Sequence, residues 1–308
     1  MARIYLLLSI CTVLLASAGC TYSPQAEGTA DHIWGTAGIT DGKLQKPRAV
    51  AIDQQDRLYI VDMTARIQVF DTEGTFLRSW KTPVSKNGRP SGLTIDRNGR
   101  LLVADTHYFR MLVYNSDGNP IESDTIGGTM GRGPGEFGFV TDIVEDSHGN
   151  YFIGEYGDFD RIQKFSHEGE FLMQWGTHGS EPGQFRRPQN MAIDQEDRIW
   201  VVDACNHRIQ VFDTDGKLLK LWGEEGSDVG QLYYPYDLAF DGQGHIYICE
   251  YGNHRVQKFT LEGKPVDSWG RHGRGPGELH NPWALARDSR GRLHVLDSNN
   301  HRVQRAIF

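Results

Sequence analysis

The chain repeats itself with a period of about 47 residues, and this period limits the folds open to it more than any other feature. Its six copies begin, in chain order, at Pro47, Pro90, Val140, Pro188, Pro235 and Pro282. One arginine recurs in every copy, at Arg66, Arg110, Arg161, Arg208, Arg255 and Arg302. The intervals between these arginines are 44, 51, 47, 47 and 47 residues. A repeat of this length is typical of propellers, solenoids and other arrays.

Each copy predicts four short β-strands. In the first copy they are the segments AVAID, RLYIVD, RIQVFD and FLRSW, which are rich in β-branched and aromatic residues at a period of two. Turn residues separate the segments in fixed register. They are Gly99, Gly149, Asp197, Gly244 and Gly291 between the first two strands, and Gly74, Gly118, Gly169, Gly216 and Gly263 between the last two. Such turns often need a positive φ, which glycine adopts freely and aspartate tolerates. Four strands in each of six copies predict an all-β fold, a six-bladed β-propeller of four-stranded blades.

The two ends of the repeat region complement one another. The sixth copy stops at Phe308, directly after its third strand, so its fourth strand is missing. The segment IWGTAG from Ile33 matches LWGEEG from Leu221, which lies at the outer strand of another copy. We therefore expect the N-terminal strand around Trp34 to pair into the last blade, which closes the ring and covers two open sheet edges.

The first 31 residues predict export. Arg3 precedes a mostly apolar run from Ile4 to Ala18, which is short for a membrane span and typical of a secretory signal core. We expect a signal peptide at residues 1–19, lipidation at Cys20 as in bacterial lipoproteins, a polar tether at 20–31 and the propeller at 32–308. This predicts a membrane-anchored lipoprotein of the bacterial envelope. Residues 16–18 also fit an ordinary cleavage site, and without lipidation the protein would be secreted or periplasmic.

The net charge limits the class of partner that we expect, and the cysteines limit the possible cross-links. The chain has 40 acidic and 32 basic residues, a formal net charge of -8, whereas a nucleic-acid-binding protein normally carries a basic field. We therefore expect no nucleic-acid partner, and we expect a monomer. An exported protein permits a disulfide between Cys205 and Cys249, and the alternative is two small buried thiols.

The chain resembles the NHL-repeat family of six-bladed propellers. The residues that carry the resemblance are Asn206-His207-Arg208-Ile209-Gln210, Asn253-His254-Arg255-Val256-Gln257 and Asn300-His301-Arg302-Val303-Gln304. The resemblance covers essentially all of residues 32–308 and implies the fold strongly. It implies function only weakly, because the family includes protein- and RNA-binding modules, sensor domains of membrane kinases and a zinc-dependent peptide-amidating lyase.

Six copies in one chain provide an internal control, because a residue present in every blade is expected to serve the blade. The six motif arginines, the acids that precede them and the tryptophans at the outer strands are therefore predicted to be framework. The acids are Asp62, Asp105, Glu155, Asp203, Glu250 and Asp297, and the tryptophans are Trp34, Trp80, Trp175, Trp222 and Trp269, with Ile126 in the second blade. His207, His254 and His301 belong to the repeat as well, so sixfold geometry is expected to spread them around the ring rather than around one zinc ion.

Residues that vary between blades are the candidates for recognition. The blade-start set is Arg48, Ser91, Thr141, Gln189, Tyr236 and Trp283, and it combines aromatic surface with hydrogen-bonding groups. Aromatic residues near the motif arginines extend it, namely Tyr108, Phe109, Tyr156, Phe159 and Tyr251. The alternative is that some of these side chains only plug the channel. Blades 2 and 3 depart most from the repeat, and their connection, ESDTIGGTMGRGPGEFGFV, is lengthened, which is typical of a partner site.

An enzymatic function is the alternative to binding. The amidating lyase of the family holds zinc through histidines just after the blade start, and none of the six blade-start residues is histidine here. A lactonase-like site with calcium or zinc needs convergent oxygens, for which Asp142, Asn190 and Asp237 are weak candidates. We therefore predict a scaffold without catalytic residues or a cofactor, which binds a protein, peptide or glycan in the cell envelope through its loop-rich face.

Overall fold

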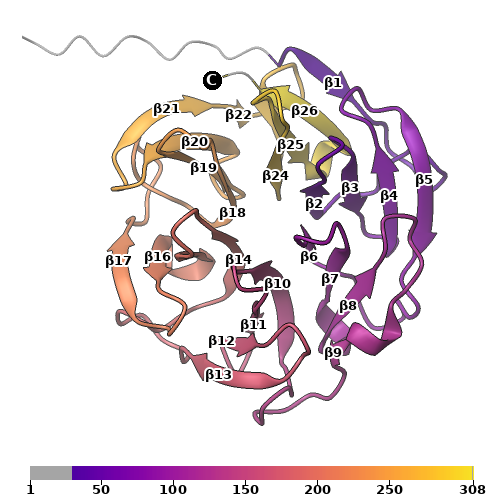
Figure 1. The fold of residues 1–308 in the computed structure, drawn as a ribbon. Coiled ribbons are helices and arrows are strands. Elements are labelled where there is room, and N and C mark those ends of the chain that lie inside the picture. Colours follow the sequence, from indigo (N-terminus) through magenta and orange to yellow (C-terminus); the bar gives the residue numbers. More distant parts are fainter. Residues whose placement is uncertain (1–29, 307) are drawn as a thin grey trace, which may run out of the picture.

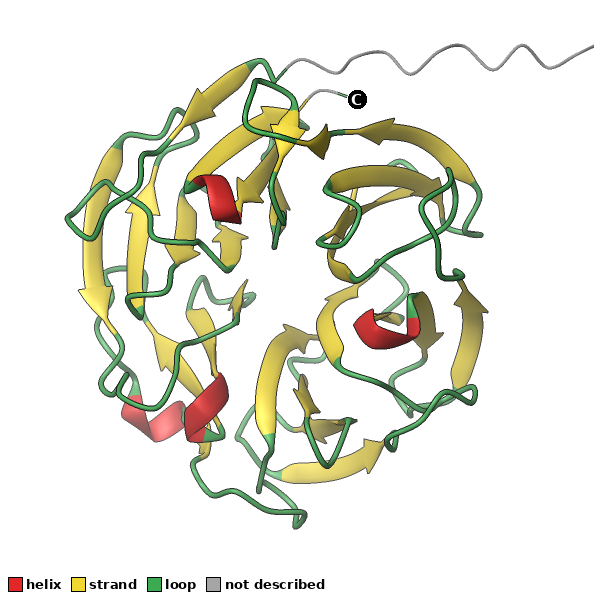
Figure 2. Ribbon diagram, turned by 180° about the vertical axis from the view of Figure 1, so that it is seen from behind, coloured by secondary structure: helices red, strands yellow, loops and turns green. Residues whose placement is uncertain are grey.

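The structure is a computed structural model that describes residues 30–306 and 308; the predicted signal peptide and Cys20 lie outside these residues. Six four-stranded antiparallel sheets form a ring, seen along its axis in Figure 1 and from behind in Figure 2. The predicted fold, a six-bladed β-propeller, is confirmed. The helical elements of the described residues are four short 3₁₀ turns, at η1 (Thr106–Tyr108), η2 (Glu122–Asp124), η3 (Ala204–Asn206) and η4 (Ser298–Asn300). No helix in the described part of the chain is long and apolar enough to cross a membrane.

The blades follow one another in sequence, and each runs from the channel outward. Blade 1 is β2 (Ala49–Ile52), β3 (Leu58–Val61), β4 (Arg66–Phe70) and β5 (Phe76–Lys81); blade 2 is β6 (Gly92–Ile95), β7 (Leu101–Asp105), β8 (Arg110–Tyr114) and β9 (Ile126–Gly127); blade 3 is β10 (Phe139–Glu145), β11 (Tyr151–Tyr156), β12 (Arg161–Phe165) and β13 (Phe171–Trp175). Blade 4 is β14 (Pro188–Ile193), β15 (Ile199–Asp203), β16 (Arg208–Phe212) and β17 (Leu218–Trp222); blade 5 is β18 (Pro235–Phe240), β19 (His245–Glu250), β20 (Arg255–Thr260) and β21 (Pro265–Trp269). Blade 6 is β24 (Leu285–Arg287), β25 (Leu293–Asp297), β26 (Arg302–Ala306) and, from the other end of the chain, β1 (His32–Trp34). A short parallel pair, β22 (Arg271–His272) with β23 (Glu278–Leu279), lies between blades 5 and 6.

The ring closes as predicted. β1 pairs antiparallel with β26, with Trp34 opposite Val303, so the outer strand of the last blade comes from the start of the described chain (Figure 1). The contact begins before the strand, because the Asp31 N–H donates to the Arg305 carbonyl at 3.1 Å. The Asp31 carboxylate also accepts a hydrogen bond from Arg305 Nε at 2.9 Å. Closure covers strand edges that would otherwise be exposed, and it joins segments far apart in sequence.

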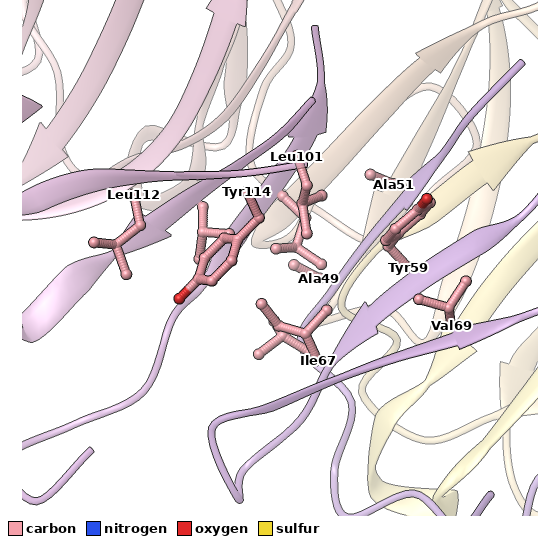
Figure 3. Packing of buried hydrophobic residues seen from close by; sticks show 11 residues of the cluster. Ala49, Ala51, Tyr59, Ile67, Val69, Leu101, Leu112 and Tyr114 are labelled. Carbon is pink, nitrogen blue, oxygen red and sulfur yellow. The ribbon is translucent and has the colours of Figure 1, made fainter. Parts of the chain in front are cut away.

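The core lies between neighbouring blades rather than at one centre. Figure 3 shows the cluster between blades 1 and 2, where Tyr59 and Ile67 of one sheet face Leu101 and Tyr114 of the next. Tyr59 and Ile67 are fully buried, because inner and middle strands are covered on both faces. Such packing, repeated around the ring, holds each blade by its neighbours.

The outer tryptophans pack on the glycine turns of the following blade. A Cβ placed on Gly74 would lie 2.5 Å from the Trp34 ring, and Gly74 also has a φ of +84°. Glycine is therefore required there twice, for its backbone conformation and for the space that the ring occupies. Equivalent contacts join Trp80 to Gly118 and Trp222 to Gly263. The predicted framework role of the tryptophans, between blades, is confirmed.

Candidate functional site

The motif arginines anchor the loops that carry the site. Each pairs with the acid that precedes it, at N–O distances of 2.6–3.1 Å, and all six acids are fully buried. In blade 4, Arg208 donates from Nε to Asp203 at 2.8 Å and from its other nitrogens to the carbonyls of Ser180, Glu181 and Gln184. Those carbonyls belong to the connection from blade 3. The predicted framework role of the arginines and acids is confirmed: they form an ion pair at the strand ends, and the arginine also fixes the incoming connection.

The motif histidines latch neighbouring blades together. The residue before each motif arginine has a positive φ, for example 55° at His207, which directs its side chain toward the next blade. His207 Nδ1 accepts the backbone N–H of Tyr234 at 3.0 Å, His254 that of Asn281 at 3.0 Å, and His301 that of Lys46 at 3.0 Å. The three histidines therefore serve three different blade junctions, as the repeat predicted.

Blade 3 makes the same latch with a carboxylate. Asp160 Oδ1 accepts the backbone N–H of Arg187 at 3.1 Å. All four donor residues, Lys46, Arg187, Tyr234 and Asn281, have a positive φ and stand immediately before a blade start. The latches bring the loops between second and third strands beside the connections between blades, and together these segments form what we call the loop-rich face.

On this face, aromatic rings from blades 5 and 6 meet over the channel. Tyr236 stacks on Tyr251 with ring centroids 4.5 Å apart. Trp283 lies edge-on to both rings, at 5.0 Å from Tyr236 and 5.6 Å from Tyr251. The pKa of the Tyr236 hydroxyl is raised, because burial disfavours its charged form more than the nearby Arg187 favours it. A rigid aromatic platform results, assembled from two blade-start residues and one loop residue.

Two guanidinium groups flank this platform. Arg48 Cζ lies 5.0 Å from the centroid of Trp283, and Arg187 Cζ lies 5.3 Å from that of Tyr236. Arg187 also covers Tyr156 of blade 3, at 5.0 Å. We call this continuous set the mouth arc; it consists of Tyr156, Arg187, Tyr236, Tyr251, Trp283 and Arg48. The cavity beneath holds about 240 Å³ including its open part, and is lined by Arg48, Ser91, Gln189, Tyr236 and Trp283 among others.

Not every predicted recognition residue joins the mouth arc. Thr141 is buried, and its hydroxyl donates to the Pro188 carbonyl at 2.7 Å. Gln189 is also buried, and its Oε1 accepts from Arg187 Nε at 2.8 Å. Ser91 shares a hydrogen bond of 2.7 Å with Thr106. These side chains support the channel wall beneath the arc, which agrees with the alternative that some blade-start residues only fill the channel.

The aromatic residues of blades 2 and 3 divide into two groups. Phe139 links Phe109, at 6.0 Å, to Tyr156, at 5.1 Å, and so extends the arc toward blade 2. Tyr108 points elsewhere, because its hydroxyl accepts the Asn87 N–H at 2.9 Å. Phe159 lies under the guanidinium groups of Arg132 and Arg161, at 5.3 and 5.5 Å. Tyr108 and Phe159 thus stabilise the loops instead of completing the arc.

Sequence reasoning missed Arg187 and Phe139. Both stand two residues before a member of the blade-start set, where the connection between blades ends and the inner strand begins. That position varies between blades as much as the blade start itself, with Lys46, Tyr234 and Asn281 as counterparts in three other blades. Extending the internal comparison by two residues toward the N-terminus would have revealed them.

The three candidate metal ligands form a second layer below the mouth. Asp142 Oδ2 accepts from Asn190 Nδ2 and from the Met191 N–H, both at 3.0 Å. Asp237 accepts the N–H groups of Leu285 at 2.8 Å and Leu238 at 2.7 Å. Burial raises the pKa of Asp142 to about 7 and that of Asp237 well above its ordinary value. The two aspartates therefore bind backbone groups of neighbouring inner strands.

These residues do not make a good cation site. Among the side-chain oxygens of Asp142, Asn190 and Asp237, two are buried without a hydrogen-bond partner in the described structure, Asp142 Oδ1 and Asn190 Oδ1. Calcium takes six to eight oxygen ligands, and zinc takes three or four ligands from Cys, His or carboxylate side chains in tetrahedral sites. In the described residues no group of three His, Cys, Asp or Glu side chains is placed to hold a metal ion. The donor set at the second layer therefore does not fit either ion.

Two features outside the mouth arc are the cysteines and a hollow on the opposite face. Cys205 and Cys249 are free thiols in different blades. A wider hollow of about 1010 Å³, including its open part, lies on the opposite face between blades 4 and 5. Its lining includes Asp194 and Gly244, which belong to the repeated turns between first and second strands. Because repeated turns are framework, this hollow is the weaker candidate.

The fold and the latches define the class of this protein, a six-bladed β-propeller that carries NHL repeats. The NHL repeat matches residues 185–212, 232–259 and 279–305, which are the connections and strands around the three histidine latches. The chain is 29% identical over 191 residues to peptidyl-glycine alpha-amidating monooxygenase B of Xenopus laevis, a stretch that covers 58% of this chain and 20% of that protein. It is 30% identical over 173 residues to NHL repeat-containing protein 3 of Mus musculus, covering 52% of this chain and 49% of that protein. The chain thus spans about a fifth of the amidating monooxygenases it matches.

Solved structures share the fold. A streptogramin B lyase structure aligns with a TM-score of 0.62 over 90% of this chain and 97% of that one, at 11% identity. A protein of unknown function from Bacteroides thetaiotaomicron aligns with a TM-score of 0.69 over 90% of this chain and 75% of that one, at 14% identity. At these identities the likeness concerns the fold alone.

Proposed function

We propose that this protein is a binding module of the cell envelope, which recognises a protein, peptide or glycan through the mouth arc. The observation that carries the proposal is the contact between Tyr236, Trp283 and the two guanidinium groups. These residues come from blades 1, 4, 5 and 6, vary between the repeats, and still meet at one place. Large aromatic side chains and arginine are the residues that most often dominate binding energy at interfaces.

The scaffold favours binding with little reorganisation. The loops that hold the arc are fixed by buried ion pairs and by latches to the next blade, so few side chains need to be ordered when a partner binds. The export and lipid anchor predicted from residues 1–31 would hold this face in the envelope, with Cys20 as the anchor. The proposed protein acts as a monomer and needs no cofactor.

A capture experiment tests the proposal. Purified protein without residues 1–20 is used to retrieve envelope components, which are quantified for the wild type and for a Tyr236→Ala/Trp283→Ala double variant. A matched control, Leu172→Ala/Leu219→Ala, removes two exposed apolar side chains from the outer strands β13 and β17. We expect the double variant to lose the captured partner and the control to retain it. Equal capture by all three proteins would refute the role of the arc.

A metal-dependent propeller enzyme, lactonase-like or similar to the peptide-amidating lyase, is the second candidate. The similarity to amidating monooxygenases over 58% of the chain favours it. The poor fit of Asp142, Asn190 and Asp237 to calcium or zinc weighs against it. Metal analysis of the purified protein distinguishes the two functions. Near-stoichiometric calcium or zinc that is lost in Asp142→Ala would favour the enzyme.

A further inference from the structure

The two arginines of the mouth arc differ from the framework arginines in their partners. All six motif arginines pair with a buried carboxylate. Within residues 30–306, neither the Arg48 nor the Arg187 side chain forms an ion pair with a carboxylate; Arg187 donates to the Gln189 amide oxygen, and Arg48 forms no side-chain hydrogen bond. In a chain of net charge -8, two half-buried guanidinium groups thus lie at the channel mouth with no anionic partner.

The surroundings add to this local positive charge. Burial lowers the pKa of Arg48, and the guanidinium groups of Arg187 and Arg89 lower it further, while Tyr156 and Tyr236 oppose the effect. Arg89 itself donates only to backbone carbonyls, among them Met63 at 2.6 Å. An arginine stays charged in such a place, so the repulsion persists until an anion is near.

The nearby carboxyl groups do not supply that anion. Asp160 accepts the backbone N–H of Arg187 and pairs with His178, so its carboxylate is already occupied. Asp142 and Asp237 lie in the second layer, and burial raises the pKa of both. Both already accept backbone N–H groups of the inner strands. Their negative charge is therefore reduced near neutral pH, and what remains is directed at the channel wall.

We propose that Arg48 and Arg187 bind an oxyanion carried by a planar apolar group, so that the ligand at the mouth is a small aromatic carboxylate or phosphate. This inference rests on the proposed binding function. The oxyanion would lie between the guanidinium groups, and the apolar part would pack on the half-buried rings of Tyr251 and Trp283. Arginine suits this role because its planar fork matches both carboxylate and phosphate.

The size of the cavity limits how far a ligand can enter. Below the arc there is space for about one water molecule, so the oxyanion would stay at the mouth, at the level of the arginines. Gln189 Oε1 accepts from Arg187 Nε and leaves the terminal nitrogens of that guanidinium as donors. The half-buried rings of Tyr251 and Trp283 offer stacking surface for a planar group, while the buried Tyr236 supports them from below.

Titration calorimetry at low ionic strength tests the proposal with four probes: benzoate, phenyl phosphate, neutral benzyl alcohol and cationic benzylamine. We expect an anion to bind at least about tenfold more tightly than benzyl alcohol, since charged hydrogen bonds outweigh neutral ones. Arg48→Gln and Arg187→Gln should each weaken anion binding about tenfold, and added salt should weaken it in the wild type. Arg186→Gln is the matched control, because Arg186 is exposed and adjacent but lies outside the arc. It should retain binding within about twofold.

The outcomes separate the inference from the function on which it rests. Stronger binding of benzoate than of phenyl phosphate would identify a carboxylate ligand, and the reverse a phosphate ligand. If benzyl alcohol binds as tightly as the anions, and Trp283→Ala abolishes this binding, the anion inference is overturned while the arc remains a binding site. If no probe binds at about 10 mM, beyond the range of even weak specific complexes, the anion inference is also overturned. The capture experiment then decides the binding function independently.

Discussion

The histidine latches predict that neighbouring blades separate more easily in acid. His207, His254 and His301 each accept a backbone N–H at Nδ1, which requires that nitrogen to be unprotonated. Burial lowers the pKa of all three. At His207, the charges of Glu225 and Asp203 oppose the lowering of the pKa. At His254, the neighbouring His272 and His280 lower the pKa further, and Asp297 opposes them. At His301, Lys46 lowers the pKa further, and Asp297 again opposes it.

These lowered pKa values set the direction in which pH changes the stability of the protein. The folded protein holds fewer protons on the latches than the unfolded chain, so the latches contribute stability above the ordinary histidine pKa of about 6.5 and lose it as pH falls through the lower folded values. A neutral hydrogen bond contributes about 0.5–1.5 kcal/mol. Loss of three latches therefore lowers the free energy of unfolding by about 1.5–4.5 kcal/mol.

A triple variant isolates the effect. Asparagine tolerates a positive φ, and its side-chain oxygen accepts but does not titrate, much as Asp160 latches Arg187 in blade 3. We expect His207→Asn/His254→Asn/His301→Asn to match the wild type near pH 8 and to exceed it in stability near pH 5. Urea unfolding followed by tryptophan fluorescence across this range measures the difference. His148→Asn/His167→Asn changes two exposed histidines as a control. The reasoning is refuted if the triple variant keeps the wild-type pH dependence.

Three other substitutions test the framework by unfolding measurements. Gly74→Ala should cost about 1–3 kcal/mol more than Gly99→Ala, because both have a positive φ but only Gly74 meets the Trp34 ring; equal losses would contradict the packing argument. Asp203→Asn should destabilise by about 3–5 kcal/mol by leaving the Arg208 charge buried, whereas Glu262→Gln at the exposed Lys220 pair should change stability by less than about 1 kcal/mol. A carboxyl group whose pKa is raised by folding makes the wild type less stable as pH rises. Asp142→Asn removes this group, so between about pH 4 and 7 its stability should rise relative to that of the wild type, by up to about 1.4 kcal/mol per pH unit. A flat difference would show that Asp142 titrates normally.

The sequence was sufficient for the fold because the same residues recur at every blade. The motif arginines meet a requirement that returns six times, and the turn glycines and outer tryptophans meet requirements that return in most blades; these requirements hold in the structure. Ring closure was also predictable, since the missing outer strand of the last blade matched the segment around Trp34.

The site was predictable only in part. Tyr236, Trp283 and Arg48 were identified because they vary at a fixed blade position, but Thr141 at the same position turns into the channel wall. The Thr141 hydroxyl is directed by the Pro188 carbonyl of the next blade, and the pattern within one repeat does not predict a contact between two blades. Arg187 was missed because the comparison between blades stopped at the blade-start set; the rings that it covers, Tyr156 and Tyr236, lie in blades 3 and 5, far from it in sequence.

Hydrogen–deuterium exchange with and without a bound ligand tests the central claim most directly. If the mouth arc is the recognition site, a ligand captured by the wild type should slow exchange around residues 46–49, 186–190, 234–237 and 281–284. Exchange at the opposite face, around residues 194–198 and 241–245 that line the wider hollow, should stay unchanged. Protection confined to those turns, with none at the mouth arc, would contradict the account.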